Sequence, residues 1–364
     1  MSNSQARTNL FWSCLQVLTR ERHEALIRVF GALENATKHI DSEVLRGLGC
    51  REETVGTVLK RMQSLDLEQE EALLTASGAR IITLGDPDYP ERLADIPDAP
   101  AFLYAQGDLS ILSQPCVALV GTRKMSPYGK RVGQEFARAL THAGIVTVSG
   151  LARGIDSQVA EEAIALQGRT VAVLGQGLLT IYPQAKVLAD RIIAAGGLIL
   201  SEFPLRMGPD MFTYPLRNRI IAGLSLATIV LEAPESSGAL ITAKLAFDYG
   251  REVFAVPGQM FDANFAGCHA IIRKNQARIA VSPRDVLQDL GVIVPDAADP
   301  ARVVYVGQNE DEKAVLGSLS TMPQSSDDLV IKSGMTVGAV SAVLTVLELN
   351  GVARNLGGGQ WIRT

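Results

Sequence analysis

The chain has 364 residues, 47% of them hydrophobic and 20% charged, and a formal net charge of −5. This length predicts two or three domains with a sizeable core, and the negative balance argues against a general cationic coat for nucleic acid. No run of about 18 uncharged apolar residues is present, so no membrane span is expected. The polar first residues and four widely spaced cysteines indicate a reduced protein of the cytoplasm.

The N-terminal part is predicted to be a helical domain over residues 1–75, because apolar residues recur there at helical spacing. A glycine turn at residues 45–49 is interpreted as a helix cap within a small bundle. The alternative is a helix-hairpin-helix contact to DNA phosphate. Residues 81–83 and 89–93, broken up by four prolines between residues 87 and 100, indicate an extended connector that packs against the next domain, and residues 102–104 form a candidate strand.

Short apolar strands and helices then alternate within a domain predicted over residues 76–291. The strands are apolar throughout, which indicates burial on both faces, as in a parallel sheet covered by helices. Right-handed crossovers place the carboxyl ends of such strands on one edge, where ligands bind. The predicted strands are 116–120, 145–148, 170–174, 198–200, 227–231 and 253–256, and the helices are 128–143, 155–166, 184–195, a stretch beginning near Pro215, and 239–249.

The last part of the chain is predicted to be a winged-helix domain over residues 306–364, after a linker at 292–305. Three helices followed by a glycine-tipped hairpin are typical of this domain. Its candidate recognition helix, 336–350, contains no Lys or Arg, whereas a helix in the major groove normally brings basic residues. We therefore expect a structural or protein-contact role for it. The helices cover 311–319, 326–331 and 337–349, and the hairpin covers 352–361.

Three connections at the predicted sheet edge carry groups that suit a phosphate. Glycines leave backbone N–H groups accessible, cationic side chains supply charge, and serines at a helix start add hydroxyls beside the positive end of the helix dipole. The ordinary alternatives are tight turns, a solvated arginine and a plain serine N-cap. The residues are Gly121, Thr122, Arg123 and Lys124 after the first strand, Gly150 and Arg153 after the second, and Ser236, Ser237 and Gly238 after the fifth.

A fourth segment, TYPLRNRIIAG, brings two arginines and an asparagine beside a proline that favours a helix start. Arg217 and Arg219 diverge by about 200° on a helix, so both are not expected to reach one phosphate. Arg217 is favoured for the ligand. Arg219 is favoured to pair with Glu202 or Glu232. Both arginines and Asn218 are kept as candidate phosphate contacts.

Nothing in the sequence marks a catalytic centre. Asp156 is predicted to cap a helix or to orient an arginine, since no second carboxylate lies at the spacing of a general acid–base pair. The four histidines are scattered. A Walker A lysine is absent, and no G-x-G-x-x-G motif opens the first crossover, which argues against ATP and NAD. We therefore predict no enzyme, no cofactor and no metal.

Six motifs run along the predicted sheet domain, and together they resemble the DprA/Smf family, the DNA-processing protein A group. This resemblance is specific for the sheet domain, and the flanking helical and winged-helix parts also look like that family's. The motifs are GTR (121–123), SGLARGID (149–156), GQGL…YP (175–183), LRNRIIAGLS (216–225), SGALITAKLAFDYGREVFAVPG (237–258) and GCHAIIRK (267–274).

The resemblance implies an extended Rossmann-like domain that binds single-stranded DNA. It also implies a homodimer that loads the RecA recombinase onto incoming strands in natural transformation, displacing the single-strand binding protein, without catalytic turnover. The DNA-contacting arginines of the family correspond to Arg123 and Arg217. The phosphate contacts named above, together with Lys186, are then contacts to DNA.

The chain departs from the family pattern at three positions. A histidine is common where this chain has Ala160. A lysine is common near Gln184, where Lys186 lies close, and another basic residue is common near Met211. These departures predict a smaller positive charge on the DNA-binding surface and a lower DNA affinity.

Two other functions fit the sequence less well. The related Rossmann-like group includes nucleoside phosphoribohydrolases, which use a G-G-x-G-T phosphate loop and an arginine–glutamate pair. This chain has the sequence SSGA at residues 236–239 instead. An interaction scaffold that binds no nucleic acid is favoured only by the acidic balance.

Overall fold

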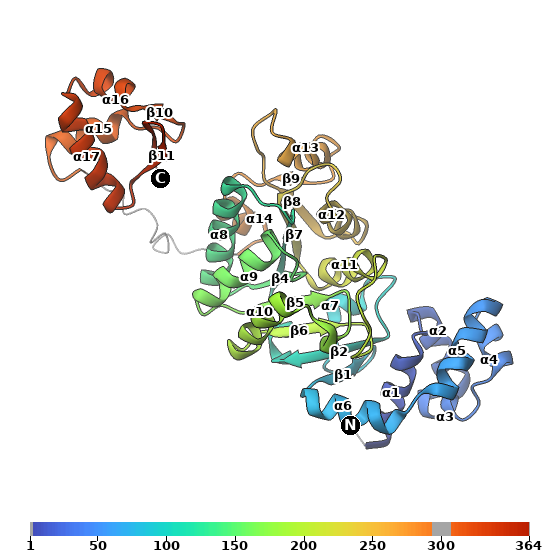
Figure 1. Cartoon of the computed structure of the whole chain (residues 1–364). Helices are drawn as coiled ribbons and strands as arrows, with labels where there is room; N and C mark the ends of the chain where they lie inside the picture. The colour runs from blue at the N-terminus through green and yellow to red at the C-terminus, as the bar shows by residue number, and fades with distance from the viewer. Residues whose placement is uncertain (1–2, 293–306, 364) are drawn as a thin grey trace. The chain divides into compact units, whose positions relative to one another are not determined.

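The computed structural model describes residues 3–292 and 307–363 of the chain. The chain divides into two compact units, residues 1–294 and 295–364. The predicted linker at 292–305 lies, except for Val292, outside the described residues. Figure 1 gives the labels of the helices and strands.

The N-terminal part is helical, and its core is shared with one face of the sheet that follows. Trp12 and Leu26 of this part belong to the same buried cluster as Phe102, and the hydroxyl oxygens of Ser13 and Tyr104 lie 2.6 Å apart. The boundary near residue 75 therefore stays a prediction. The helices are α1 (Asn3–Leu15), α2 (Arg20–Phe30), α3 (Leu33–Thr37), α4 (Ser42–Gly47), α5 (Glu52–Ser64) and α6 (Leu67–Ser77).

A nine-stranded sheet forms the centre of the first unit, in the order β1-β2-β6-β5-β4-β3-β7-β8-β9. The strands from β6 to β9 are parallel, whereas β1 and β2 are antiparallel additions at one side. The predicted parallel sheet is confirmed. The strands are β1 (Arg80–Thr83), β2 (Phe102–Gly107), β3 (Cys116–Gly121), β4 (Val146–Ser149), β5 (Thr170–Leu174), β6 (Leu198–Ser201), β7 (Ala227–Glu232), β8 (Glu252–Ala255) and β9 (Arg278–Ile279).

The segment predicted as an extended connector contributes two of these strands. Ile82 pairs with Leu103 across β1 and β2, and Ala105 pairs with Leu200 of β6. The proline-rich stretch between the two strands holds only the short helix α7 (Glu91–Ala94). The connector interpretation was therefore wrong for β1, while the candidate strand at 102–104 is confirmed.

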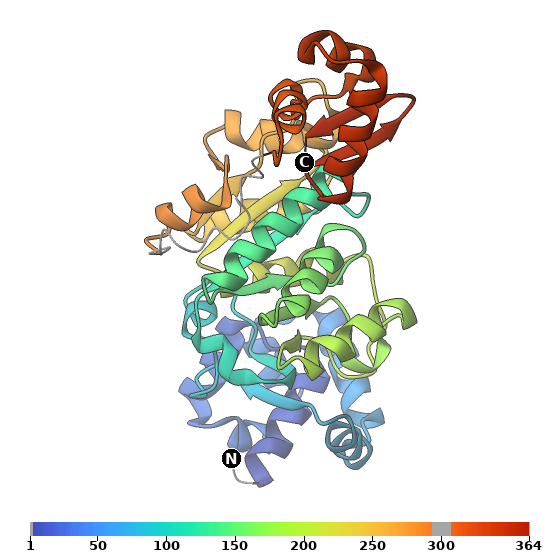
Figure 2. The same ribbon diagram turned by 90° about the vertical axis from the view of Figure 1, so that its left-hand side faces the viewer.

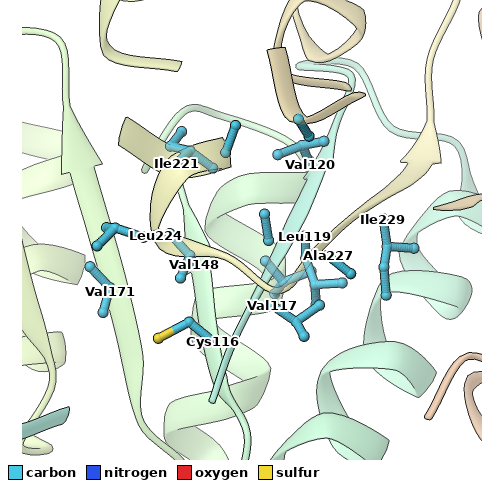
Figure 3. Packing of buried hydrophobic residues seen from close by; sticks show 14 of the residues in the cluster. Cys116, Val117, Leu119, Val120, Val148, Val171, Ile221, Leu224, Ala227 and Ile229 are labelled. Atoms are coloured by element: carbon cyan, nitrogen blue, oxygen red, sulfur yellow. The ribbon is translucent and has the colours of Figure 1, made fainter. Parts of the chain in front are cut away.

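Helices cover both faces of the sheet (Figures 1 and 2). One face carries α8, α9 and α10, and the other carries α11 and α12, because the crossovers reverse direction between β6 and β7. Figure 3 shows Ile221 and Leu224 of α11 over Val120 and Val148 of the sheet. The helices are α8 (Pro127–His142), α9 (Ile155–Ala165), α10 (Pro183–Ala194), α11 (Thr213–Leu224), α12 (Ala239–Asp248), α13 (Ala266–Arg273) and α14 (Pro283–Asp289).

The second unit is a winged helix, as predicted. Trp361 of the hairpin packs in a small core with Leu329, Leu344 and Leu347. Among the described residues, no single helix is long and apolar enough to cross a membrane. The pair α16 and α17 reaches that length and apolarity only when the two helices are added together, and they are bent by 108° at the break between them. The elements are α15 (Glu310–Ser318), β10 (Gln324–Ser325), α16 (Ser326–Ser333), α17 (Val337–Leu349), β11 (Ala353–Gly357) and β12 (Gln360–Arg363).

Candidate functional site

A cleft of about 750 Å³ opens at the carboxyl ends of β3 and β7. These strands are neighbours, and the chain leaves them in opposite directions along the sheet. Such a point leaves a crevice where ligands bind in open α/β sheets. The cleft is lined mainly by residues within 120–124, 209–218 and 234–242, together with Ala152, Asp156, Tyr182 and Ile221. Of the candidate phosphate contacts, it brings together Gly121, Thr122, Arg123, Lys124, Arg217, Asn218, Ser236, Ser237 and Gly238.

The turn after β3 is held tightly beneath the cleft. The Thr122 N–H donates to the Glu232 carbonyl oxygen at 2.8 Å, and its hydroxyl oxygen accepts from the Lys124 N–H at 3.2 Å. A Cβ on Gly121 would lie 2.6 Å from the Ile155 side chain, so only glycine fits there. The turn therefore presents the exposed side chains of Arg123 and Lys124 from a fixed backbone.

Glu232 supports the same turn from below. It is fully buried at the end of β7. Its carboxylate accepts from the N–H of Ser126 at 3.0 Å and from the hydroxyl of Ser126 at the same distance, directly before α8. Glu232 was a candidate partner of Arg219, but its carboxylate instead binds Ser126 at the start of α8.

Arg217 forms part of the cleft lining. Its side chain is buried, and Nη1 donates to the carbonyl oxygens of Gly150, at 2.8 Å, and of Val173. Nε donates to Asn218 Oδ1 at 2.9 Å. Burial lowers the pKa of the guanidinium, and the nearby Asp156 opposes that shift. These contacts fasten α11 to the ends of β4 and β5, and the role of Arg217 as a phosphate ligand stays a prediction.

Asp156 holds the loop that leads into α9, and its role in orienting an arginine stays a prediction. Its carboxylate accepts from the N–H groups of Gly150, at 3.1 Å, and Ala152, at 3.4 Å. Burial raises the pKa of this carboxyl, while the positive charge of Arg217 lowers it. A Cβ on Gly150 would lie 2.2 Å from Arg217 Nη2. The absence of a side chain at Gly150 therefore leaves room for the Arg217 guanidinium, and the Asp156 carboxylate holds the loop around that guanidinium.

Arg219 points elsewhere, as the divergence on the helix predicts. It is buried, its Nη2 binds Glu202 Oε1, and its Nε lies 3.7 Å from Asp98 Oδ2. The predicted pairing with Glu202 is confirmed. The inclusion of Arg219 among the phosphate contacts was wrong, because the salt bridge holds its guanidinium away from the cleft lining.

The connection between β7 and α12 supplies hydroxyls to the cleft. Ser237 Oγ accepts from the Ala239 N–H at 3.3 Å, while the Ser236 side chain is exposed. Asn218 Nδ2 donates to the Gly238 carbonyl oxygen at 3.4 Å, which ties this loop to α11. The N-cap residue of α12 is Gly238, which makes no side-chain cap hydrogen bond, so the plain serine N-cap of the ordinary alternative is not what the structure has. Ser237 bonds within the turn before the helix and lies on the cleft wall.

A second hollow of about 540 Å³ adjoins the cleft and shares Arg123, Lys124 and Tyr214 with it. The predicted contacts Gly150 and Arg153 line this hollow and not the cleft. Lys186 lines neither hollow, and its ammonium group pairs with Asp190.

Two tyrosines at this site were missed by the sequence reasoning. Arg123 Cζ lies 5.6 Å from the centroid of the Tyr214 ring, which is a cation–π contact. The Tyr214 hydroxyl donates to Gln176 Oε1 at 3.1 Å. Tyr182 is exposed and lines both hollows. Tyr214 directly precedes Pro215 in the arginine segment, and that position was the available signal.

The cations at the mouth are not neutralised within the described residues. Arg123, Lys124 and Arg153 are exposed, and none forms an ion pair with a carboxylate in residues 3–292 or 307–363. In the same part of the chain, no group of three or more His, Cys, Asp or Glu side chains is placed to hold a metal ion. The cleft lining holds Arg123, Lys124 and Arg217 against Asp156 and Asp210, so its formal charge is positive in a chain of net charge −5.

Fold and site together define a Rossmann-like α/β protein with a basic, phosphate-suited cleft at the switch point of its sheet, followed by a winged helix. Residues 80–291 match the model for DNA recombination-mediator protein A, and residues 295–359 match the DprA winged helix domain. The chain therefore belongs to the DprA/Smf family.

Relatives in the family match along most of the chain. Protein Smf of Synechocystis is 34% identical over 97% of both chains, and Protein Smf of Escherichia coli is 34% identical over 88% of this chain and 87% of its own. DNA processing protein DprA of Bacillus subtilis is 40% identical over 58% of this chain and 72% of its own.

Two solved structures of family members resemble this one. DNA processing protein A from Streptococcus pneumoniae has a TM-score of 0.65 and 34% identity, covering 78% of this chain and 97% of that chain. DNA processing protein A from Helicobacter pylori, described by its single-stranded DNA binding mode, has a TM-score of 0.52 and 31% identity, covering 58% and 95%.

Proposed function

We propose that this chain binds single-stranded DNA in the cleft between the carboxyl ends of β3 and β7. The observation that carries the proposal is the exposed guanidinium of Arg123, unpaired with any carboxylate in the described residues and placed over the ring of Tyr214. A cation beside an aromatic face suits a phosphate followed by an unpaired base, since unpaired bases leave their faces free to stack. The single-stranded DNA binding mode of the Helicobacter pylori relative supports the same assignment.

The test is a salt-titrated binding measurement with a labelled oligothymidylate. Arg123→Ala should weaken binding and make the dependence of log K on log salt shallower by about 0.7, the value for one lost single-strand phosphate contact. Arg28→Ala is the matched control, because Arg28 is exposed on α2 and contributes nothing to the cleft lining. Equal affinity and slope for Arg123→Ala and the native protein would show that the site is assigned wrongly.

The finer role that we propose is that of a recombination mediator acting in the cytoplasm. A homodimer would load the RecA recombinase onto single strands taken up in transformation, and would displace the single-strand binding protein. Membership of the family supports this role. The experiment is RecA filament assembly on strands coated with the single-strand binding protein. No acceleration by this chain would contradict the mediator role.

We propose binding without catalysis at this site. The buried carboxylate in the cleft lining, Asp156, accepts from two backbone N–H groups and is held within the loop around Arg217. It is therefore committed to holding the loop and not to proton transfer. Incubation with nucleoside monophosphates tests the alternative directly, since release of free base would establish a hydrolase.

A further inference from the structure

The first turn of α8 lies beside the cleft and exposes an aromatic ring. Tyr128 is 50% exposed. Its ring centroid lies 5.6 Å from that of Phe265, with the two planes at 62°. The turn that lines the cleft, residues 121–124, leads into this helix, and the neighbouring Gly129 packs directly above the Glu232 carboxylate. The ring is therefore fixed on one side by Phe265 and open to solvent on the other.

An exposed cation accompanies this ring. Arg131 follows Tyr128 by three residues, so the two side chains share one face of the helix. Arg131 is exposed and forms no ion pair with a carboxylate among the described residues, and the same is true of Lys124. Glu135, one turn further along that face, lies 3.5 Å from Arg138.

Two exposed lysines on other helices of the same unit are neutralised, in contrast, by a carboxylate on their own helix. Lys186 pairs with Asp190 on α10, and Lys244 pairs with Asp248 at 2.6 Å on α12. Lys124 and Arg131, which precede and follow Tyr128 in the chain, thus keep their charge unneutralised among the described residues.

We propose that a single strand longer than the cleft continues across the first turn of α8, with one base stacked on Tyr128 and the adjoining phosphates bound by Lys124 and Arg131. This inference rests on the proposed DNA-binding function and adds a second segment to its site. A groove of cations interleaved with an aromatic side chain is the arrangement that binds unpaired nucleotides without regard to sequence.

The test compares short and long oligothymidylates with five variants, one of them Arg123→Ala from the test of the proposed function. Tyr128→Ala and Arg131→Ala should leave the affinity for the shortest strand that binds unchanged, and should weaken binding of long strands about tenfold, the effect of losing one stacked base or its phosphate. Tyr128→Phe keeps the ring and should bind long strands as the native protein does. Arg28→Ala is again the control for loss of one exposed cation.

The outcomes separate this inference from the proposed function. If Arg123→Ala weakens strands of every length while Tyr128→Ala and Arg131→Ala bind long strands normally, the cleft is correct and the α8 segment is overturned. If Arg123→Ala has no effect at any length, the proposed function itself fails. A change in self-association of Tyr128→Ala, with unchanged DNA binding, would make this surface a protein contact and would also overturn the inference.

Discussion

Arg217 Nη1 donates a 2.8 Å hydrogen bond to the carbonyl oxygen of Gly150, and this contact joins the first turns of α11 to the end of β4. The same nitrogen also donates to the carbonyl oxygen of Val173 at the end of β5. One buried guanidinium thus holds together three connections at the carboxyl edge of the sheet. Its contribution to stability should be separable from any contribution to DNA binding.

Arg217→Ala should lower the free energy of unfolding by about 2–3 kcal/mol, because it leaves two buried carbonyl oxygens without donors. Denaturant unfolding of the variant measures this. Arg123→Ala is the comparison, since its exposed side chain should change stability by less than about 0.5 kcal/mol. If Arg217→Ala proved as stable as the native protein, the guanidinium would not be the fastening that we describe.

Gly129→Ala should destabilise the protein by about 2 kcal/mol or more. A Cβ at this position would lie 1.6 Å from Glu232 Oε2 and would displace the carboxylate that receives the Ser126 N–H. The matched variant is Gly56→Ala, where no heavy atom lies within 4 Å of the new Cβ inside α5.

Gly56→Ala should stabilise the protein by about 0.5–1 kcal/mol, because alanine favours a helix interior. Thermal unfolding of both glycine variants gives the comparison. The same sign for the two would contradict the packing described here.

Three of the four thiols should react slowly in the native protein. Burial raises the pKa of Cys14 to about 11 and the pKa values of Cys116 and Cys268 to about 12. At pH 8 the thiolate fraction of Cys14 is then about 0.1%, and the thiolate is the reactive form. Iodoacetamide labelling followed by peptide mass spectrometry should find these three residues unmodified until urea is added. Rapid labelling of Cys268 in the native state would contradict its burial.

His23 should make stability depend on pH on the acidic side of neutrality. Burial lowers the pKa of this imidazole, with Glu24 and Asp86 opposing the shift. The unfolded chain therefore takes up the proton first as the pH falls below about 6.5, so the free energy of unfolding decreases there and this contribution is intact above it. His23→Gln should flatten the slope of that free energy between pH 7 and pH 5. An unchanged slope would assign the titration to other groups.

The sequence was most informative where the pattern is local. The apolar strands of the parallel sheet and the three helices of the winged helix depend on short-range periodicity and caps, and they appear at the expected places. β1 was missed because its pairing with β2 spans a proline-rich stretch, and the pairing of Ile82 with Leu103 is not visible in either segment alone.

The candidate site was predicted in part. Arg123 and Ser237 line one cleft because strand ends meet at one edge, which topology alone requires. The divergence of Arg217 and Arg219 also followed from helix geometry. The burial of Arg217 could not be predicted, since its acceptors are backbone carbonyl groups of residues 150 and 173, far away in the chain.

The order of the sheet has a consequence for aggregation. Its outermost strands, β1 and β9, are four and two residues long. Each carries an arginine in a salt bridge, Arg80 with Asp88 at 2.8 Å and Arg278 with Asp289 at 2.6 Å. Short edge strands with charged side chains offer few free backbone groups for pairing with a strand of a neighbouring molecule. Concentrated solutions of the folded protein should therefore resist the growth of cross-β fibrils from these edge strands.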